Sequence, residues 1–237
     1  MPDQDTGCPK EAIAMRPKRN GLGLKRLALL TVAACLGTAV AQRPVTVSGT
    51  IPNPTAKSGT IVAWAGYFDM SPTGAIAFGE VTADGNFSFD LPGQIRGDVL
   101  HPVEAKNICQ AGGQDLVMEP RSTTHVLVNT LMAFDTSSTP VLATLASSRD
   151  LLQRLSNDKA DVGAADALGY YFYVDRAIRI RGSCVSADGL SVTYDVNAAV
   201  GWNLLAYTFE EQGGVVTGKI ATVRSFPPQL GWVSSVE

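Results

Sequence analysis

The chain has 237 residues, with 19 Lys and Arg against 22 Asp and Glu, and a formal net charge of −3. This weakly acidic balance argues against nucleic-acid binding, which depends on clustered cations, and against an anionic membrane surface. The length allows one sizeable hydrophobic core or two small ones.

The N-terminal segment has the features of a secretory signal. Lys25-Arg26 precedes an apolar run, Leu27–Leu36, which has the length of a signal-peptide core and is too short to span a membrane. Ala39-Val40-Ala41 is an A-x-A cleavage site, so residues 1–41 are predicted to be removed and Gln42 to become the first residue. This predicts an exported protein of the periplasm or cell envelope. No other stretch of the sequence is long and apolar enough for a transmembrane span.

Two alternatives concern the same segment. Val32-Ala33-Ala34-Cys35 resembles a bacterial lipobox, in which Cys35 would carry a lipid anchor and become the first residue. Acidic residues close to Met1 do not suit a signal, and translation from Met15 would leave an ordinary basic leader. Removal of residues 1–41 takes away six basic and three acidic residues, which leaves a net charge of −6.

The chain beyond the signal is predicted to be mostly β. Apolar residues alternate in short runs between turns, which is the period of half-buried strands. The first such runs cover residues 45–51, 60–65, 76–82 and 86–91. Asp84-Gly85 separates the last two runs and is a strong hairpin signal.

Residues 45–92 resemble the small β-sandwich modules of the carboxypeptidase-regulatory or transthyretin-like kind. The resemblance lies in Val47-Ser48-Gly49-Thr50-Ile51 and in Thr82-Ala83-Asp84-Gly85-Asn86-Phe87-Ser88-Phe89, which precedes Leu91-Pro92. Such modules are usually structural or binding accessories, so the resemblance implies no catalytic residue.

The elements after residue 92 are also predicted from the spacing of apolar residues. Residues 93–121 are expected to be a long loop with one short strand, and residues 124–134 a buried strand. Between residues 141 and 167 the apolar spacing changes to three and four, which predicts a helical insertion, with Ser148 at the start of its second helix. Strands are expected to resume over residues 170–181, 190–196, 202–210 and 215–223. The spacing favours one domain over residues 42–237, a sandwich of antiparallel sheets or a partial barrel.

The segment 171–205 resembles a block of uncharacterised exported proteins of bacterial envelopes. Its elements are Tyr173-Val174-Asp175-Arg176, Gly182-Ser183-Cys184, Thr193-Tyr194-Asp195-Val196 and Gly201-Trp202-Asn203. The resemblance implies an envelope location and no particular activity.

Two cysteines, Cys109 and Cys184, remain after removal of the signal. In an oxidising compartment they are expected to form a disulfide. Closing this loop of about 75 residues would stabilise the fold by about 4 kcal/mol in the chain-entropy model. Two buried thiols are the alternative, and a zinc site is poorly supported because there is no C-x-x-C pair.

Histidine restricts the possible chemistry. His101 and His125 are the two in the chain, and a copper site would need Met132, a carboxylate or a second subunit to complete it. A hydrogen-bonded structural role is the alternative for each histidine. The sequence contains no G-x-S-x-G serine elbow, calcium loop or phosphate-binding loop.

Arg176, Arg179 and Arg181 form the basic cluster of the mature chain and are the candidate site for an acidic polysaccharide or an envelope protein. The alternative is a solvated strand edge, whose charges prevent pairing with another chain. Trp64 and Trp202 sit inside strand runs and are expected in the core; the alternative is a sugar-stacking platform formed with Trp232. Trp232 follows two prolines and is expected at the surface.

These observations favour a non-enzymatic structural or partner-binding protein of the envelope, without a cofactor. One alternative is a copper-dependent oxidoreductase of the superoxide-dismutase type, which the compartment and the two histidines would suit. The other is a soluble ligand carrier, for which an apolar cavity would be the sign.

Overall fold

A computed structural model describes residues 42–51, 58–66, 72–108, 115–121, 123–134, 141–156, 162–186 and 189–234. The chain divides into Met1–Ala39 and Val40–Glu237, and all described residues belong to the second unit. The predicted signal segment, the lipobox cysteine Cys35 and both possible start residues therefore lie outside the described residues.

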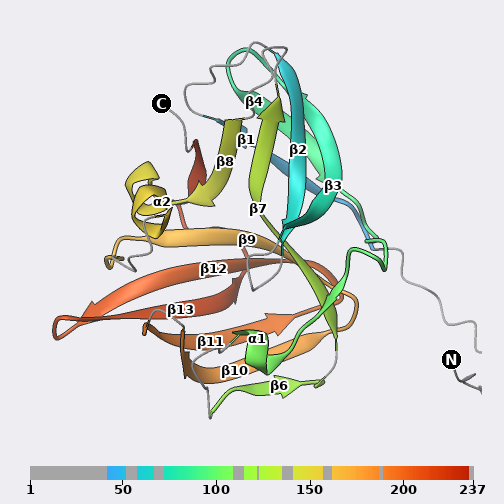
Figure 1. Ribbon diagram of the computed structural model, residues 1–237. Coiled ribbons are helices and arrows are strands. Elements are labelled where there is room, and N and C mark those ends of the chain that lie inside the picture. The colour runs from blue at the N-terminus through green and yellow to red at the C-terminus, as the bar shows by residue number, and fades with distance from the viewer. Residues whose placement is uncertain are drawn as a thin grey trace, which may run out of the picture. The chain divides into compact units, whose positions relative to one another are not determined.

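The predicted mostly β, largely antiparallel fold is confirmed. In chain order the described elements are β1 (Val45–Thr50), β2 (Gly59–Gly66), β3 (Pro72–Val81), β4 (Asn86–Leu91), β5 (His101–Pro102), α1 (Ala105–Ile108), β6 (Val117–Glu119), β7 (Thr124–Phe134), β8 (Val141–Ala146), α2 (Arg149–Ser156), β9 (Ala167–Val174), β10 (Ile178–Val185), β11 (Ser191–Ala198), β12 (Gly201–Gln212), β13 (Val215–Val223) and β14 (Gly231–Ser234) (Figure 1).

These strands share one hydrogen-bonded path, β1-β4-β3-β2-β7-β8-β9-β12-β13-β11-β10-β6, with β5 on β7 and β14 on β8. The long strand β7 divides the path, because residues 130–133 pair with β8 while residues 125–128 pair with β9. We call β1, β4, β3, β2, β8 and β14 with the end of β7 the first sheet. The second sheet is the beginning of β7 with β9, β12, β13, β11, β10 and β6. Figure 1 shows the first sheet above the second.

The buried residues form three clusters. Three consecutive residues of β7, Val126, Leu127 and Val128, are buried in three different clusters. Residues 125–128 of β7 pair with β9 in regular register, so Leu127 points to one side of the strand and Val126 and Val128 to the other, where they enter separate clusters. The first-sheet cluster includes Val47, Ile61, Leu91, Leu131 and Ala143, and the second-sheet cluster includes Phe172, Val174, Ile180, Val196 and Leu205.

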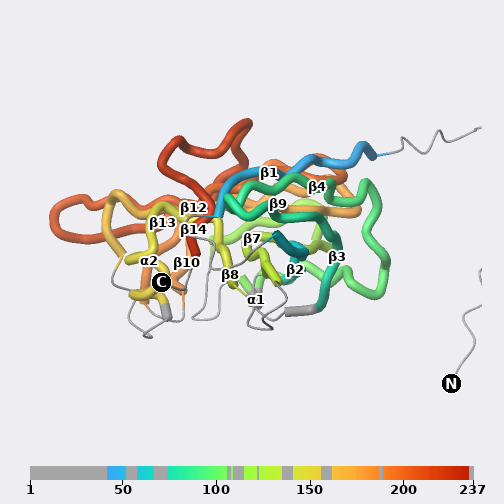
Figure 2. Tube along the Cα trace, turned by 90° about the horizontal axis from the view of Figure 1, so that it is seen from above, coloured from blue at the N-terminus to red at the C-terminus, as the bar shows by residue number. Residues whose placement is uncertain are grey.

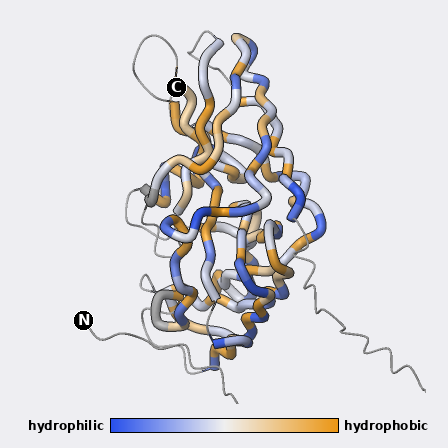
Figure 3. Tube along the Cα trace, turned by 90° about the vertical axis from the view of Figure 1, so that its right-hand side faces the viewer, coloured by the Kyte–Doolittle hydropathy of each residue, from blue (hydrophilic) through white to orange (hydrophobic). Residues whose placement is uncertain are grey.

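The alternating runs behave as their sequences predict. In β4 the apolar residues Phe87, Phe89 and Leu91 are buried while the residues between them are exposed. The same strict alternation occurs in β11. Hydrophobic and hydrophilic residues alternate along many of the strands in Figure 3, because one face of each sheet covers a core.

The expected helical insertion is smaller than predicted. Residues 141–146 are not helical but form β8, in which Val141, Ala143 and Leu145 are buried. The helix is α2, and Ser148 caps it as predicted, because its Oγ accepts a hydrogen bond from the Leu151 N–H at 3.1 Å. Both α2 and β14 lie beside β8 (Figure 2).

The prediction for Trp232 was wrong. The chain returns after its two prolines as β14 and pairs with β8. Trp232 is buried, and its ring packs edge-on against Phe87 at 5.8 Å. Gly49 makes room for the indole, because a Cβ at Gly49 would lie 2.5 Å from Trp232 Cδ1. Trp64 and Trp202 are half-buried.

Candidate functional site

The two predicted copper ligands lie opposite each other on adjacent strands. The register of β5 and β7 pairs His101 directly with His125. The buried His125 holds its Nδ1 at 2.9 Å from the carbonyl oxygen of His101. A carbonyl oxygen can only accept, so Nδ1 donates and the imidazole is oriented by the backbone of β5. His125 also packs against the ring of Phe172, with centroids 5.9 Å apart.

The described part of the chain supplies no further His, Cys, Asp or Glu ligand beside this pair. Among the residues that the structure describes, no group of three His, Cys, Asp or Glu could hold a metal ion. Met132 lies seven residues further along β7, roughly 23 Å at the rise of a strand, and pairs with Val62 and Leu142 in the first sheet. Met132 therefore cannot join His101 and His125 at one metal. The copper site stays a prediction that would need a carboxylate from outside the described residues or a ligand from a second subunit.

Arg179 and Arg181 of the arginine cluster lie on β10, and Arg176 lies in the turn before it. Arg176, Arg179 and Arg181 are all exposed. The register places Arg179 opposite Glu119, and Arg181 Nε lies 3.8 Å from Asp195 Oδ1. An exposed pair at this distance contributes little to stability. Neighbouring carboxylates reduce the positive potential that an acidic polysaccharide would need, so the arrangement suits a solvated strand face better than a polyanion site.

Asp175, beside Arg176, fixes the turn after β9. Its carboxylate accepts hydrogen bonds from the Thr123 hydroxyl at 2.7 Å and from the Thr124 N–H at 2.8 Å. Burial by itself would raise the pKa of Asp175, but these hydrogen bonds outweigh it and lower the pKa below its usual value. The carboxylate therefore joins the start of β7 to the end of β9 in its charged form, and its role is structural.

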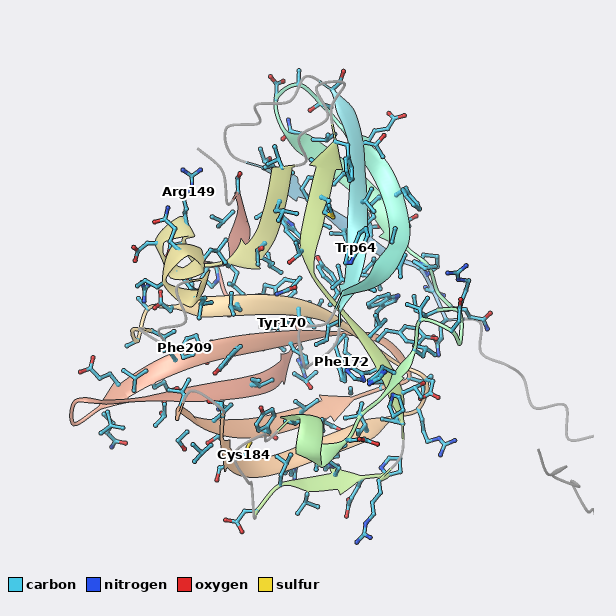
Figure 4. All side chains as sticks on the ribbon, in the orientation of Figure 1. Trp64, Arg149, Tyr170, Phe172, Cys184 and Phe209 are labelled. Carbon is cyan, nitrogen blue, oxygen red and sulfur yellow. The ribbon has the colours of Figure 1, made fainter. Side chains whose placement is uncertain are left out.

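The buried tyrosines are unsuited to proton transfer. Burial raises the pKa of Tyr194 to about 12. Burial also raises the pKa of Tyr170, and the nearby Tyr194 adds to that shift. Both side chains belong to the second-sheet cluster, where Figure 4 labels Tyr170. Their hydroxyls stay neutral near pH 7, so neither can serve as a general base.

Cys184 lies on the inward face of β10 and is buried in the second-sheet cluster (Figure 4). Its predicted partner, Cys109, lies outside the described residues. Ile108, which directly precedes Cys109, is buried in the same cluster as Cys184. The chain next to Cys109 is thus held in the core that contains Cys184, and the pairing itself stays a prediction.

An open hollow of about 580 Å³ lies between α1 and β6. Its lining mixes charged and apolar side chains: Glu104, Ala105, Leu116, Val117, Met118 and Arg121. A ligand carrier would present an enclosed, mainly apolar cavity. This hollow is a surface depression with both signs of charge, so it does not favour that alternative.

The outer face of the first sheet carries a row of apolar side chains. Phe78, Val62, Met132 and Leu142 are directly opposite one another across β3, β2, β7 and β8. Directly paired residues point to the same side of a sheet, and the flanking residues of each strand point into the first-sheet cluster. We call these four residues the apolar row. Phe78 is 66 % exposed and Leu142 is 39 % exposed, while Val62 is buried between its neighbours.

The rest of this outer face shows that the apolar row is local. Trp64 and Phe134 flank the row, together with the hydroxyls of Thr60, Thr130 and Thr144. On β1 and β4 of the same sheet, by contrast, the exposed residues are all polar: Thr46, Ser48, Thr50, Asn86, Ser88 and Asp90. The apolar character therefore belongs to four strands and not to the whole outer surface.

Sequence reasoning missed the apolar row, although a signal was present. In Ala77-Phe78 and in Leu131-Met132-Ala133-Phe134, apolar residues occupy both faces of a strand that should need only one. A second apolar face on an otherwise alternating strand indicates either a second layer or a binding surface.

Comparison of the chain with protein-family models, with curated proteins and with solved structures finds no match. The helices among the described residues include none with the length and apolar character needed to cross a membrane. Fold and surface together define a mostly β protein with three buried clusters and an exposed apolar sheet face.

Proposed function

We propose that this chain is an exported protein of the cell envelope that binds a partner protein through the apolar row and performs no catalysis. The observation that carries the proposal is the register of Phe78, Val62, Met132 and Leu142 across four strands, beside a polar surface on the same sheet. Protein interfaces are centred on apolar and aromatic side chains and are depleted of charge at their core.

The chemistry of the face indicates a protein as the occupant. The apolar row contains no charged residue, and the acidic residue Glu80 lies at its rim opposite Thr60. An acidic polysaccharide would require cations, whereas a flat apolar surface is complementary to another flat apolar surface. The exposed aromatic ring of Phe78 has the character of an interface hot spot.

Export is the second part of the proposal and is supported by the basic pair, the short apolar run and the A-x-A site that precede Gln42. A Cys109–Cys184 disulfide belongs to it, because the oxidising envelope favours pairing and the neighbour of Cys109 lies in the core around Cys184. We expect protein purified from the envelope to show no reactive thiol after denaturation, and two after reduction. Two reactive thiols without reduction would contradict the pairing.

The partner-binding proposal is tested by site-specific photo-crosslinking in the envelope of the producing cell. A photoreactive residue at Phe78 is expected to crosslink to one discrete protein, and the same residue at Ser88, exposed on the polar part of the same face, is not. Leu142→Asp should weaken that crosslink about tenfold or more, as expected of a charge placed in an interface core, while the melting temperature stays nearly unchanged.

Three outcomes would contradict this proposal. Equal crosslinking from positions 78 and 88 would show that the apolar row is not a specific surface. A crosslink to a second copy of this chain would make the face a self-association surface. A crosslink that Leu142→Asp leaves unchanged would exclude the apolar row as its origin.

A further inference from the structure

Gln42 is held against the protein by two glycines that are far from it in sequence. Its carbonyl oxygen lies against Gly93, where a Cβ would collide with it. Its side chain covers Gly201, with Oε1 at 3.2 Å, Cδ at 3.3 Å and Cγ at 3.6 Å from the position that a Cβ would take. Gly201 has a φ of 96°, which other residues rarely adopt. The two glycines thus form a slot for Gln42. A larger residue at either glycine position would occupy that slot with its own side chain.

The slot holds Gln42 by shape. The Oε1 atom is buried, and no described residue donates a hydrogen bond to it. An unpaired buried amide oxygen is unfavourable, so packing against Gly201 must offset that cost. The residue precedes β1, and Gly93 follows β4, so the docked residue fixes the start of the β1–β4 pair.

We propose that Gln42, once it is the first residue, is converted to pyroglutamate and that this uncharged ring occupies the slot between Gly93 and Gly201. The inference rests on the proposed export, since cleavage after Ala41 creates the free amine. The uncharged α-amine nitrogen forms a bond to Cδ and gives up one proton to Nε2, the bond from Cδ to Nε2 breaks, and Nε2 leaves as ammonia. No oxidant or reductant is needed.

The surroundings favour the ring over the open glutamine. A free α-amine has a pKa of roughly 7.7–8.0, so it is mostly charged near neutral pH, while a sizeable fraction can still react. The exposed Arg43 places a second positive charge beside it, which favours the uncharged, reactive amine. A charged amine must remain hydrated, and this opposes docking of the residue to which it is attached. The ring carries no charge and has fewer torsions to immobilise.

The first test is mass spectrometry of the N-terminal peptide from protein purified from the envelope. We expect a peptide that begins at residue 42 and is lighter than the glutamine form by one ammonia. Gln42→Asn is the matched control, because its shorter side chain cannot close the same five-membered ring and should leave a free amine. An open Gln42 would overturn this inference and leave the export proposal intact, whereas retention of residues 1–41 would overturn both.

The second test addresses the slot. Pyroglutamyl aminopeptidase should release residue 42 from the folded protein about tenfold or more slowly than from the urea-unfolded protein, because a docked terminus must first open. Gly201→Ala should remove this protection, since its Cβ would displace the residue. Equal release from the folded and unfolded protein would overturn the docked ring, even if the modification is present.

Discussion

Replacing Phe172 by alanine is expected to lower the free energy of unfolding by about 3–5 kcal/mol. Phe172 is fully buried in β9, with Leu127 of β7 opposite it on one side and Asn203 of β12 on the other. Its ring also packs against His125, with ring centroids 5.9 Å apart. The alanine variant would leave a cavity where the ring was. Strand β9 cannot shift to fill that cavity, because it is hydrogen-bonded to β7 on one edge and to β12 on the other. Most of the lost packing therefore appears as lost stability.

Thermal or urea unfolding of the purified protein measures this effect, and Phe78→Ala is the matched control. The same side chain is removed in both variants, but Phe78 is 66 % exposed and its loss should change the free energy of unfolding by about 0.5 kcal/mol or less. A similar loss for both phenylalanines would show that the second-sheet cluster is not the core on which the fold depends.

The second large effect is expected at Arg154 of α2. Its guanidinium forms two parallel hydrogen bonds of 3.0 Å to Asp166, which also accepts the Gly163 N–H. Burial alone would lower the pKa of Arg154, but its hydrogen bonds to Asp166 and Asp150 outweigh burial and raise the pKa. Arg154→Ala leaves the Asp166 carboxylate, only 9 % exposed, without its cation.

We expect Arg154→Ala to cost about 2–3 kcal/mol, less than a fully buried pair would, because 24 % of the arginine side chain is exposed. The control is Asp150→Ala, which removes the exposed partner of the same arginine at 2.9 Å and should cost about 0.5 kcal/mol or less. Urea unfolding of both variants at the same ionic strength measures the difference. Equal costs would show that the Asp166 contact is no stronger than an ordinary surface ion pair.

Local sequence patterns predicted many of the strands because strand period and turn chemistry act over a few residues. The alternation in β4 and β11, the hairpin at Asp84-Gly85 and the cap at Ser148 are all of this kind. Local patterns gave the wrong element at β8, because the spacing of Val141, Leu142 and Leu145 fits a helix as well as a strand. They failed again at Trp232, because pairing with β8 is a contact between distant segments that the preceding prolines do not prevent.

The apolar row depends on which strands pair with one another, and this cannot be read from neighbouring residues. Phe78 and Leu142 belong to strands that the sequence does not join, and the row exists because β2 and β7 pair Val62 with Met132. The slot of Gln42 likewise requires Gly93 and Gly201, which are distant in the sequence, to meet this residue ahead of β1. The sequence by itself determined the fold class, most strands and the helix cap, because each is written in neighbouring residues. Only the tertiary structure decided which strands pair, and therefore which apolar side chains enter a core and which are left facing solvent.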